Sequence, residues 1–284
     1  MSGSLALPTD ISDVVARALA EDVGGGDATA ALIEPAQRAT AELRVREEAV
    51  LCGSAWFDDV FRQLDPAIAV SWHYADGAAL ENNVTVCTVA GPARAILTGE
   101  RTAINFLQTL SGTATAVQRF VAALGHTRTR LLDTRKTLPG LRSAQKYAVR
   151  CGGGLNHRQG LFDAILIKEN HIAACGGSIA AAVERARSLS PSLPLEVEVE
   201  NLAQLREALQ TQADRLLLDD FTPEQLREAV ALRDAHAGAR KELEASGGID
   251  IANVRAIAEA GVDYISIGGL TKHVRALDFS LRVV

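Results

Sequence analysis

The chain has 284 residues, a formal net charge of −6 and 48% hydrophobic residues. This length and composition suffice for one large or two ordinary domains with a full buried core. The acidic balance and the aromatic content of only 4% argue against nucleic-acid binding, which relies on basic surfaces and stacking rings.

The first part of the chain predicts an α+β domain. Residues 8–21 have apolar positions at helical spacing, and residues 53–64 form a second helical pattern. Short β-rich runs surround that second helix, at 38–51, 68–75, 83–91 and 93–99. Such runs, broken by Gly, Pro and Asn, indicate an antiparallel sheet. We expect four aromatic residues in its core: Trp56, Phe57, Phe61 and Trp72. The glycine loop at 22–27 is interpreted as a turn.

A longer helical pattern covers residues 99–124, with a weak point at Ser111–Gly112. We place the domain boundary there, which gives an N-terminal domain at 1–111 and a second domain at 112–270. Arg101 lies in the first turn of this helix, where a positive charge opposes the helix dipole. Helix stability therefore does not explain Arg101.

The second domain alternates strand, loop and helix. Six apolar runs are predicted strands: 128–133, 162–168, 193–200, 215–220, 239–246 and 263–269. Alternating βα units favour a parallel sheet, closed or nearly closed into a barrel. A capping signature at Thr222–Gln225 supports the helix phase. The predicted fold class is α/β, an α+β domain followed by an irregular, incomplete barrel. The tail at 271–284 is apolar enough to pack against the rest of the protein instead of extending into solvent.

The start of the sequence and the cysteines predict the compartment. The start shows no basic segment followed by an apolar core, and no run approaches the roughly 18 apolar residues of a membrane span. The four cysteines, at 52, 87, 151 and 175, show neither a CxxC pair nor a metal-ligand spacing, so we expect reduced, mostly buried thiols. These observations predict a cytoplasmic protein without a membrane partner.

Seven cationic residues fall within 135–168: Arg135, Lys136, Arg142, Lys146, Arg150, Arg158 and Lys168. A basic centre in an acidic protein predicts local recognition of phosphate or carboxylate groups. The three at 142, 146 and 150 share one helical face, which we interpret as solvated. Thr134–Lys136, Asn156–Arg158 and Lys168 stand where strands meet loops, and α/β proteins place their chemistry there. His157 is interpreted as a hydrogen-bond donor to an anion rather than a general base.

Glycine turns follow the last two predicted strands, at Ser246–Gly248 and Gly268–Gly269. In barrel enzymes the corresponding loops present backbone N–H groups to a phosphate. The alternative is two ordinary tight turns.

The run LEVEVE alternates strictly, which places Glu196, Glu198 and Glu200 on one face of a strand. Carboxylates inside a barrel need cations such as Lys168 or Lys136, a metal, or ligand hydroxyls. Glu198 and Asp219, at neighbouring strand ends, suit Mg2+ held through substrate oxygens or water. For Glu196 and Glu200 we favour structural ion pairing.

Five segments resemble quinolinate phosphoribosyltransferase: ERTAINFLQTLSG, DTRKTLPGLR, GGGLNHRQGLFDAILIKENHI, LEVEVEN and SGGI. The resemblance runs nearly end to end. It implies a type II phosphoribosyltransferase, an N-terminal α+β sandwich with an incomplete α/β barrel, with the tail packed back on the first domain. The implied reaction converts quinolinate and phosphoribosyl pyrophosphate into nicotinate mononucleotide, pyrophosphate and CO2, with Mg2+, in NAD biosynthesis.

The resemblance also assigns residues and assembly. The implied substrate-binding residues are Arg101, Thr134, Arg135, Lys136, His157, Arg158, Lys168, Glu198, Asp219, Ser246, Gly247, Gly248, Ile267, Gly268 and Gly269. Those implied for catalysis are Lys136, Lys168, Glu198 and Asp219, the last two near the metal. The resemblance implies a homodimer in which Arg101 acts on the partner's site, and it leaves open a larger assembly, a hexamer of such dimers.

Two other functions stay open beside the one that the resemblance implies. A relative could act on another anionic acceptor, since paralogues of the fold share most of the motif. A Schiff-base aldolase could use Lys168 as a nucleophile at a strand end. A binding protein without activity is disfavoured, because the chain keeps both signs of charge that the chemistry needs.

Overall fold

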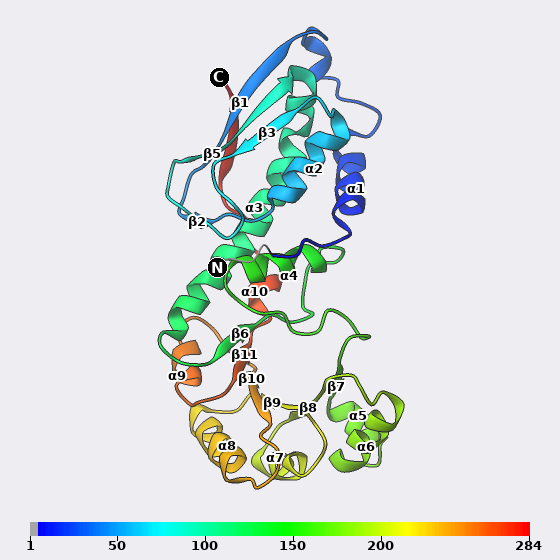
Figure 1. The fold of residues 1–284 in the computed structure, drawn as a ribbon, viewed down its shortest axis with the longest axis vertical. Coiled ribbons are helices and arrows are strands. Elements are labelled where there is room, and N and C mark those ends of the chain that lie inside the picture. Colours follow the sequence, from blue (N-terminus) through cyan, green and yellow to red (C-terminus); the bar gives the residue numbers. More distant parts are fainter. Residues whose placement is uncertain (1–4) are drawn as a thin grey trace. The chain divides into compact units, whose positions relative to one another are not determined.

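The computed structural model describes residues 5–284 (Figure 1). Residues 1–4, which belong to the predicted N-terminal domain and to the start that was predicted to carry no targeting segment, lie outside the described residues. The chain forms two compact units. One comprises the residues up to 118 together with 137–153 and 270–284, and the other comprises 119–136 and 154–269. We expected a boundary at residue 111 with the tail at 271–284 returning to the first domain, whereas the first unit extends to residue 118 and also contains residues 137–153.

The first unit has the α+β composition expected from its sequence. Its helices are α1 (Ile11–Val23), α2 (Ser54–Leu64), most of α3 (Ala93–Leu124) and α4 (Arg142–Cys151), with a short 3-10 turn η1 (Ala30–Leu32). Its main sheet is antiparallel in the order β12 (Phe279–Val283), β1 (Arg38–Val45), β5 (Thr85–Pro92), β3 (Ala69–Trp72). A small antiparallel pair joins β2 (Ala49–Val50) to β4 (Ala79–Leu80).

The strand β12 comes from the tail that was expected to dock. It pairs antiparallel with β1, with Leu281 opposite Leu43 and Phe279 opposite Val45. All four side chains are buried. The tail therefore completes the sheet of the first unit and contributes to its core.

Aromatic side chains fill the core of the first unit as predicted. Trp56, Phe57 and Phe61 are buried, and the Phe57 ring lies 5.0 Å from that of Phe61 and 5.2 Å from that of Trp72. Trp72 is only half-buried and donates its indole N–H to Asp58. Three of the four residues thus belong to the interior, and the fourth lies at its edge.

The structure of residues 93–99 and the burial of Lys146 differ from the sequence-based expectation for the first unit. Residues 93–99, expected as a strand, form the first turns of α3. Lys146, expected on a solvated helix face, is buried with 2% of its surface exposed. Both errors arise because short segments carry little information about their tertiary surroundings.

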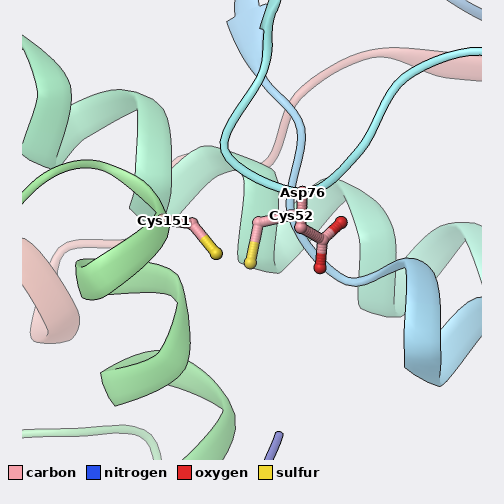
Figure 2. A group of neighbouring side chains, drawn as sticks. All are labelled: Cys52, Asp76 and Cys151. Carbon is pink, nitrogen blue, oxygen red and sulfur yellow. The ribbon is translucent and has the colours of Figure 1, made fainter. Parts of the chain in front are cut away.

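Asp76 stabilises the N-terminus of α2 (Figure 2). Its carboxylate accepts the backbone N–H groups of Gly53 and Ser54 at 3.1 and 3.2 Å, and the Tyr147 hydroxyl at 3.0 Å. These bonds satisfy helix donors that would otherwise lack partners. They also join α4 to the loop that contains Asp76.

Two cysteines lie beside this carboxylate. The sulfur atoms of Cys52 and Cys151 point toward each other, and one ligand atom of each cysteine and of Asp76 lies within 4.8 Å of the others (Figure 2). Burial raises the pKa of the Cys52 thiol. Because Asp76 is engaged in helix capping, we interpret this group as a packing contact. The sequence spacing of the cysteines gave no sign of it.

The second unit contains the predicted parallel sheet. Its strands are β6 (Arg130–Leu132), β7 (Ile165–Ile167), β8 (Leu195–Val199), β9 (Arg215–Asp219), β10 (Glu242–Ser246) and β11 (Tyr264–Ser266), in the order β6-β11-β10-β9-β8-β7. The intervening helices are α5 (Glu169–Ala174), α6 (Ile179–Leu189), α7 (Leu202–Leu209), α8 (Pro223–Ala235) and α9 (Val254–Ala258). The helix α10 (Gly269–Lys272) follows β11 and, apart from Gly269, belongs to the first unit.

All six strands were predicted, and every pairing in this sheet is parallel. The capping box at Thr222 and Gln225 is present at the start of α8, with Pro223 at the first helical position. Because the strands are parallel, their carboxyl ends meet at one edge of the sheet. No helix within residues 5–284 is long and apolar enough to cross a membrane.

Candidate active site

A cavity of about 340 Å³ lies at the carboxyl edge of the parallel sheet. It brings together nine of the residues that the sequence singled out: Thr134, Arg135, Lys136, His157, Arg158, Lys168, Glu198, Asp219 and Ser246. Four further residues complete the lining: Leu166, Leu217, Glu244 and Ser266. Cationic and anionic groups therefore face one cavity.

An ion pair joins the ends of two neighbouring strands in this cavity. The Lys168 ammonium lies 2.5 Å from the Glu198 carboxylate. Burial raises the pKa of Glu198, and this lysine opposes the shift. The sequence expectation that a barrel glutamate needs a cation such as Lys168 is confirmed.

Asp219 adds a second carboxylate at the end of β9. Burial and the neighbouring Asp220 raise its pKa, whereas the charges of Lys168 and Lys136 lower it. Glu198 and Asp219 thus repel each other while facing two lysines. Carboxylate oxygens at two neighbouring strand ends are the type of ligand that Mg2+ prefers.

Two carboxylates shape the basic loop that follows Gly154. Asp133 is fully buried and accepts the Asn156 side-chain amide at 2.6 Å and the His157 backbone N–H at 2.9 Å. Asp163 accepts the backbone N–H groups of residues 159 and 160 at 2.6 and 2.9 Å. These bonds fix the loop on both sides of Arg158.

Arg158 lies close to a second arginine. Burial lowers the pKa of its guanidinium, and repulsion from Arg135 lowers it further. The Arg158 guanidinium also donates to the Ala164 carbonyl at 3.2 Å. Two neighbouring guanidinium groups at one cavity wall favour an anionic ligand, because a bound anion relieves their mutual repulsion.

His157 is held through both ring nitrogens. Its Nε2 lies 2.8 Å from Oε2 of Glu196 and 3.7 Å from Oε2 of Glu244. The backbone N–H of Arg158 donates to Nδ1 at 2.7 Å. Glu196 thus has the structural role expected for it, through a hydrogen bond with the His157 ring, while Glu200 is exposed.

The two glutamates below His157 are unusual acids. Burial raises the pKa of Glu196 to about 7 although Arg215 lowers it, and burial with repulsion from Glu196 raises the pKa of Glu244 to about 8. Oε1 of each has no hydrogen-bond partner among the described residues. Glu244, which lines the cavity, thus tends to keep its proton at neutral pH, whereas Glu196, which does not line it, has a pKa of about 7.

The glycine turns lie beside the cavity. Gly247 and Gly248 have φ values of +98° and +56°, which favour glycine, and a Cβ on Gly247 would clash with the Asp220 carboxylate. A Cβ on Gly268 would lie 2.9 Å from Cδ of Lys136. Gly268 thus leaves space for a predicted catalytic lysine. Ile267 is buried, and Gly269 begins α10.

Arg101 is placed elsewhere. It is exposed on the part of α3 that belongs to the first unit, where it lines a different cavity with Asp22, Asp27 and Thr98. The glycine loop at 22–27 is tied to α3, because Thr102 donates to Asp22 at 3.0 Å and Thr98 donates to Asp27 at 2.9 Å. The loop thus forms the turn that the sequence indicated.

The sequence interpretation missed two carboxylates at the site. Asp133 closes the first predicted barrel strand, and Glu244 lies in the run KELEA. In that run Glu242 and Glu244 alternate with apolar residues, as the glutamates of LEVEVE do. The same pattern argument would have placed Glu244 inside the barrel.

Family models match most of the chain. The model described as "Quinolinate phosphoribosyl transferase, N-terminal domain" matches residues 27–111, and that for the C-terminal domain of the same enzyme matches residues 113–282. The join between the two matches lies next to Gly112, where the sequence had suggested a boundary.

Curated relatives cover nearly the whole chain. The "Probable nicotinate-nucleotide pyrophosphorylase (carboxylating)" of Bacillus subtilis is 41% identical over 263 residues, which are 93% of this chain and 90% of the relative. The nicotinate-nucleotide pyrophosphorylase (carboxylating) of Mycobacterium leprae is 42% identical over 276 residues, 95% of each chain. A solved nicotinate-nucleotide pyrophosphorylase from Francisella tularensis is 47% identical with a TM-score of 0.94, covering 100% of both chains.

Proposed function

Because the chain belongs to the quinolinate phosphoribosyltransferase family, we propose that it transfers phosphoribosyl from phosphoribosyl pyrophosphate to quinolinate with decarboxylation. The products are nicotinate mononucleotide, pyrophosphate and CO2, and the reaction serves NAD biosynthesis. One observation carries the proposal. The cavity at the strand ends combines arginines and lysines with the Glu198 and Asp219 carboxylates, as a reaction between an anionic ring and a phosphorylated sugar requires.

We assign the acceptor end of the cavity to its cations. Quinolinate carries two carboxylates, and Arg135, Arg158 and Lys168 provide the charges to neutralise them. Fixed cations also hold the ring nitrogen in position to attack the ribose carbon. The relief of repulsion between the two arginines adds to acceptor binding.

We assign the donor end to Lys136, Glu198, Asp219 and the glycine turns at 246–248 and 267–269. Glu198 and Asp219 would hold Mg2+, directly or through water and substrate oxygens, and the bound ion would neutralise the pyrophosphate. Lys136 stabilises the same leaving group. The backbone of the two turns binds the 5′-phosphate, because glycine permits close approach.

The reaction then needs little beyond positioning and charge. As the bond to pyrophosphate loosens, positive charge develops on the ribose, and the cavity carboxylates stabilise it. The ring nitrogen takes the place of the leaving group. Loss of CO2 follows, because the N-ribosylated pyridinium accepts the electron pair left by the carboxylate.

The aldolase alternative is disfavoured by the surroundings of Lys168. A Schiff-base lysine must be a free amine, usually in an apolar pocket or next to another cation. Lys168 is instead paired with a carboxylate, that of Glu198, at 2.5 Å. An enzyme for another anionic acceptor would share the same cavity, so the acceptor must be tested directly.

We also propose a twofold homodimer in which Arg101 reaches the site of the partner subunit. The support is that Arg101 is exposed and lies in the first unit, whereas the other proposed ligands lie in the second. Such dimers could assemble further into a hexamer. We place the enzyme in the cytoplasm, where its four free cysteines stay reduced.

The direct test is incubation with quinolinate, phosphoribosyl pyrophosphate and Mg2+, followed by mass spectrometry of nicotinate mononucleotide and measurement of released CO2. We expect CO2 and pyrophosphate in equal amounts. If another pyridine acid causes release of pyrophosphate without CO2, that acid and not quinolinate is the acceptor. A borohydride-stable adduct at Lys168 with a carbonyl substrate would instead support the aldolase.

A further inference from the structure

His157 and Arg158 belong to a wall that two cavities share. Both residues line the candidate active site, and both also line a second cavity of about 500 Å³ together with Glu196 and Arg215. Glu196 is 6% exposed and is absent from the lining of the active-site cavity. It therefore stands behind His157 as seen from the proposed substrate.

The hydrogen bonds of His157 define its tautomer. Nδ1 accepts the backbone N–H of Arg158 at 2.7 Å, so Nδ1 carries no proton. The neutral ring then carries its proton on Nε2, which donates to Glu196 at 2.8 Å. Because the Glu196 carboxyl accepts this bond, it specifies which nitrogen is protonated.

This arrangement argues against a metal ion at the cluster of His157, Glu196 and Glu244, although their ligand atoms lie within 4.8 Å of one another. A metal at Nε2 would take the position of the proton and leave Nδ1 as an acceptor, which requires an imidazolate. The buried carboxyls Glu196 and Glu244 already compete for one N–H donor. The cluster is better suited to holding a ring than an ion.

We propose that Glu196 is a positioning residue for acceptor binding: it fixes His157 as the Nε2–H tautomer, and His157 in turn holds the backbone of Arg158 at the cavity wall. The proposal rests on the proposed function for the role of Arg158. Glu196 itself does not touch the substrate. Its effect passes through two hydrogen bonds, from Glu196 to the His157 ring and from that ring to the Arg158 backbone.

The contacts of the loop explain how the Glu196 carboxyl can affect the position of Arg158. Asp133 fixes the His157 backbone from one side, and Asp163 fixes residues 159 and 160 from the other. Between them, the Arg158 backbone N–H is held by the His157 ring. Releasing that ring frees the one residue of the loop that carries a guanidinium into the cavity.

Two variants of Glu196 separate the effect of its hydrogen bond to His157 from the effect of its negative charge. Glu196→Gln keeps an oxygen that accepts from Nε2, so we expect the Michaelis constant for quinolinate to stay close to wild type. Glu196→Leu removes the acceptor at similar size. We expect it to raise the KM for quinolinate about tenfold or more, with little change in the KM for phosphoribosyl pyrophosphate.

Asp263→Asn provides the matched control. Asp263 pairs with Arg233 and Arg240 at 2.7 and 2.6 Å, and it does not line the active-site cavity. This variant should lower the melting temperature while leaving the KM for quinolinate unchanged. If it raises that KM as much as Glu196→Leu does, the effect of Glu196 is general destabilisation and the proposal fails.

A measurement on the His157 ring depends neither on catalysis nor on whether the Glu196→Leu variant folds. In 15N NMR of histidine-labelled wild-type protein, His157 should show a protonated Nε2 and an unprotonated Nδ1, and Glu196→Gln should preserve this pattern. A protonated Nδ1 in the wild type would overturn the proposal. If no acceptor is turned over, the proposed function fails, while the NMR result still decides the tautomer.

Discussion

The Nζ atom of Lys168 lies 2.5 Å from Oε2 of Glu198, although the lysine side chain is 43% exposed and the glutamate only 9%. The lysine follows β7 and the glutamate lies in the adjacent strand β8. One ammonium thus neutralises a nearly buried carboxylate and also faces the cavity. Its removal affects both functions at once.

Lys136→Ala and Lys168→Ala should each reduce turnover severely without unfolding the protein. Both lysines are at least partly exposed, so they contribute little to the core. Loss of one charge-assisted contact in the transition state should cost about 2 to 4 kcal/mol in the barrier. Steady-state kinetics and circular dichroism measure the two effects. As a control, Arg227→Ala removes an exposed ion pair with Glu224 and should leave kinetics unchanged.

Gly268→Ala should act through Lys136. The new Cβ would lie 2.9 Å from Cδ of the lysine, so the lysine side chain must shift, and we expect turnover to fall roughly tenfold to 100-fold. A double-mutant cycle tests this reason. In a Lys136→Ala background the glycine substitution should cost little more, whereas a full additive loss would show that Gly268 acts independently.

Glu244→Gln should stabilise the protein increasingly as the pH rises. The pKa of Glu244 is raised to about 8 from its ordinary 4.5, chiefly by burial. A raised pKa means that the folded chain binds this proton more tightly than the unfolded chain, so the stability it contributes is complete below about pH 4.5 and is lost as the pH rises through about 8. Glutamine needs no proton. The melting temperature of the variant relative to wild type should therefore rise between about pH 5 and pH 9, by an amount on the order of 5 °C.

Quinolinate should be a far better substrate than nicotinate, which has one carboxylate. A cavity with Arg135, Arg158 and Lys168 leaves a cation without its anion when one carboxylate is missing. We expect kcat/KM to differ by at least on the order of 100-fold. Binding of quinolinate should also weaken with added salt, since charge dominates it. Comparable efficiency on both acids would contradict the assignment of the cations.

Mixing two inactive variants should restore activity if Arg101 acts on the partner's site. Heterodimers of Arg101→Ala and Lys136→Ala subunits would contain one intact and one doubly broken site. Random exchange of equal amounts makes half of the dimers mixed, so roughly a quarter of wild-type activity should return. If Arg101 serves its own chain, every site stays broken and the mixture remains inactive.

The pattern of elements in the second unit was readable from the sequence because each signal is local. The six apolar runs and the Thr222–Gln225 capping box depend only on neighbours in the chain. Residues 93–99 show the limit of such signals. They contain β-favouring Ile96 and Thr98, yet they begin a helix of 32 residues whose packing decides their state.

Gly112 illustrates a second limit. A glycine after a serine suggested a weak point in the helix, but α3 continues through it. Ser111 exchanges hydrogen bonds with the backbone of Cys52, and a Cβ on Gly112 would lie 2.1 Å from the Arg275 carbonyl oxygen. The glycine is needed for close approach of a distant segment. Sequence alone does not show which segment approaches.

The cationic and acidic residues of the site were found because they sit at predicted strand ends. Their partners were not, since contacts such as His157 with Glu196 depend on how a loop folds over the end of a sheet. The alternation in LEVEVE placed the glutamates on one face but could not say that one would bind Lys168 and the other His157. The sequence did predict a functional role for Glu198 and a structural one for Glu196, but the partner of each carboxylate comes only from the fold.

The pairing of β12 with β1 has a consequence for how the protein is made. β1 is synthesised early, and its partner strand emerges from the ribosome only after all six strands of the second unit. Until then one edge of β1 exposes unpaired backbone groups, a template for pairing with other chains. The sheet of the first unit therefore stays incomplete, with one edge of β1 unpaired, until β12 has been synthesised. A chain that ended before β12 would keep this edge of β1 open and would be prone to pair with other chains.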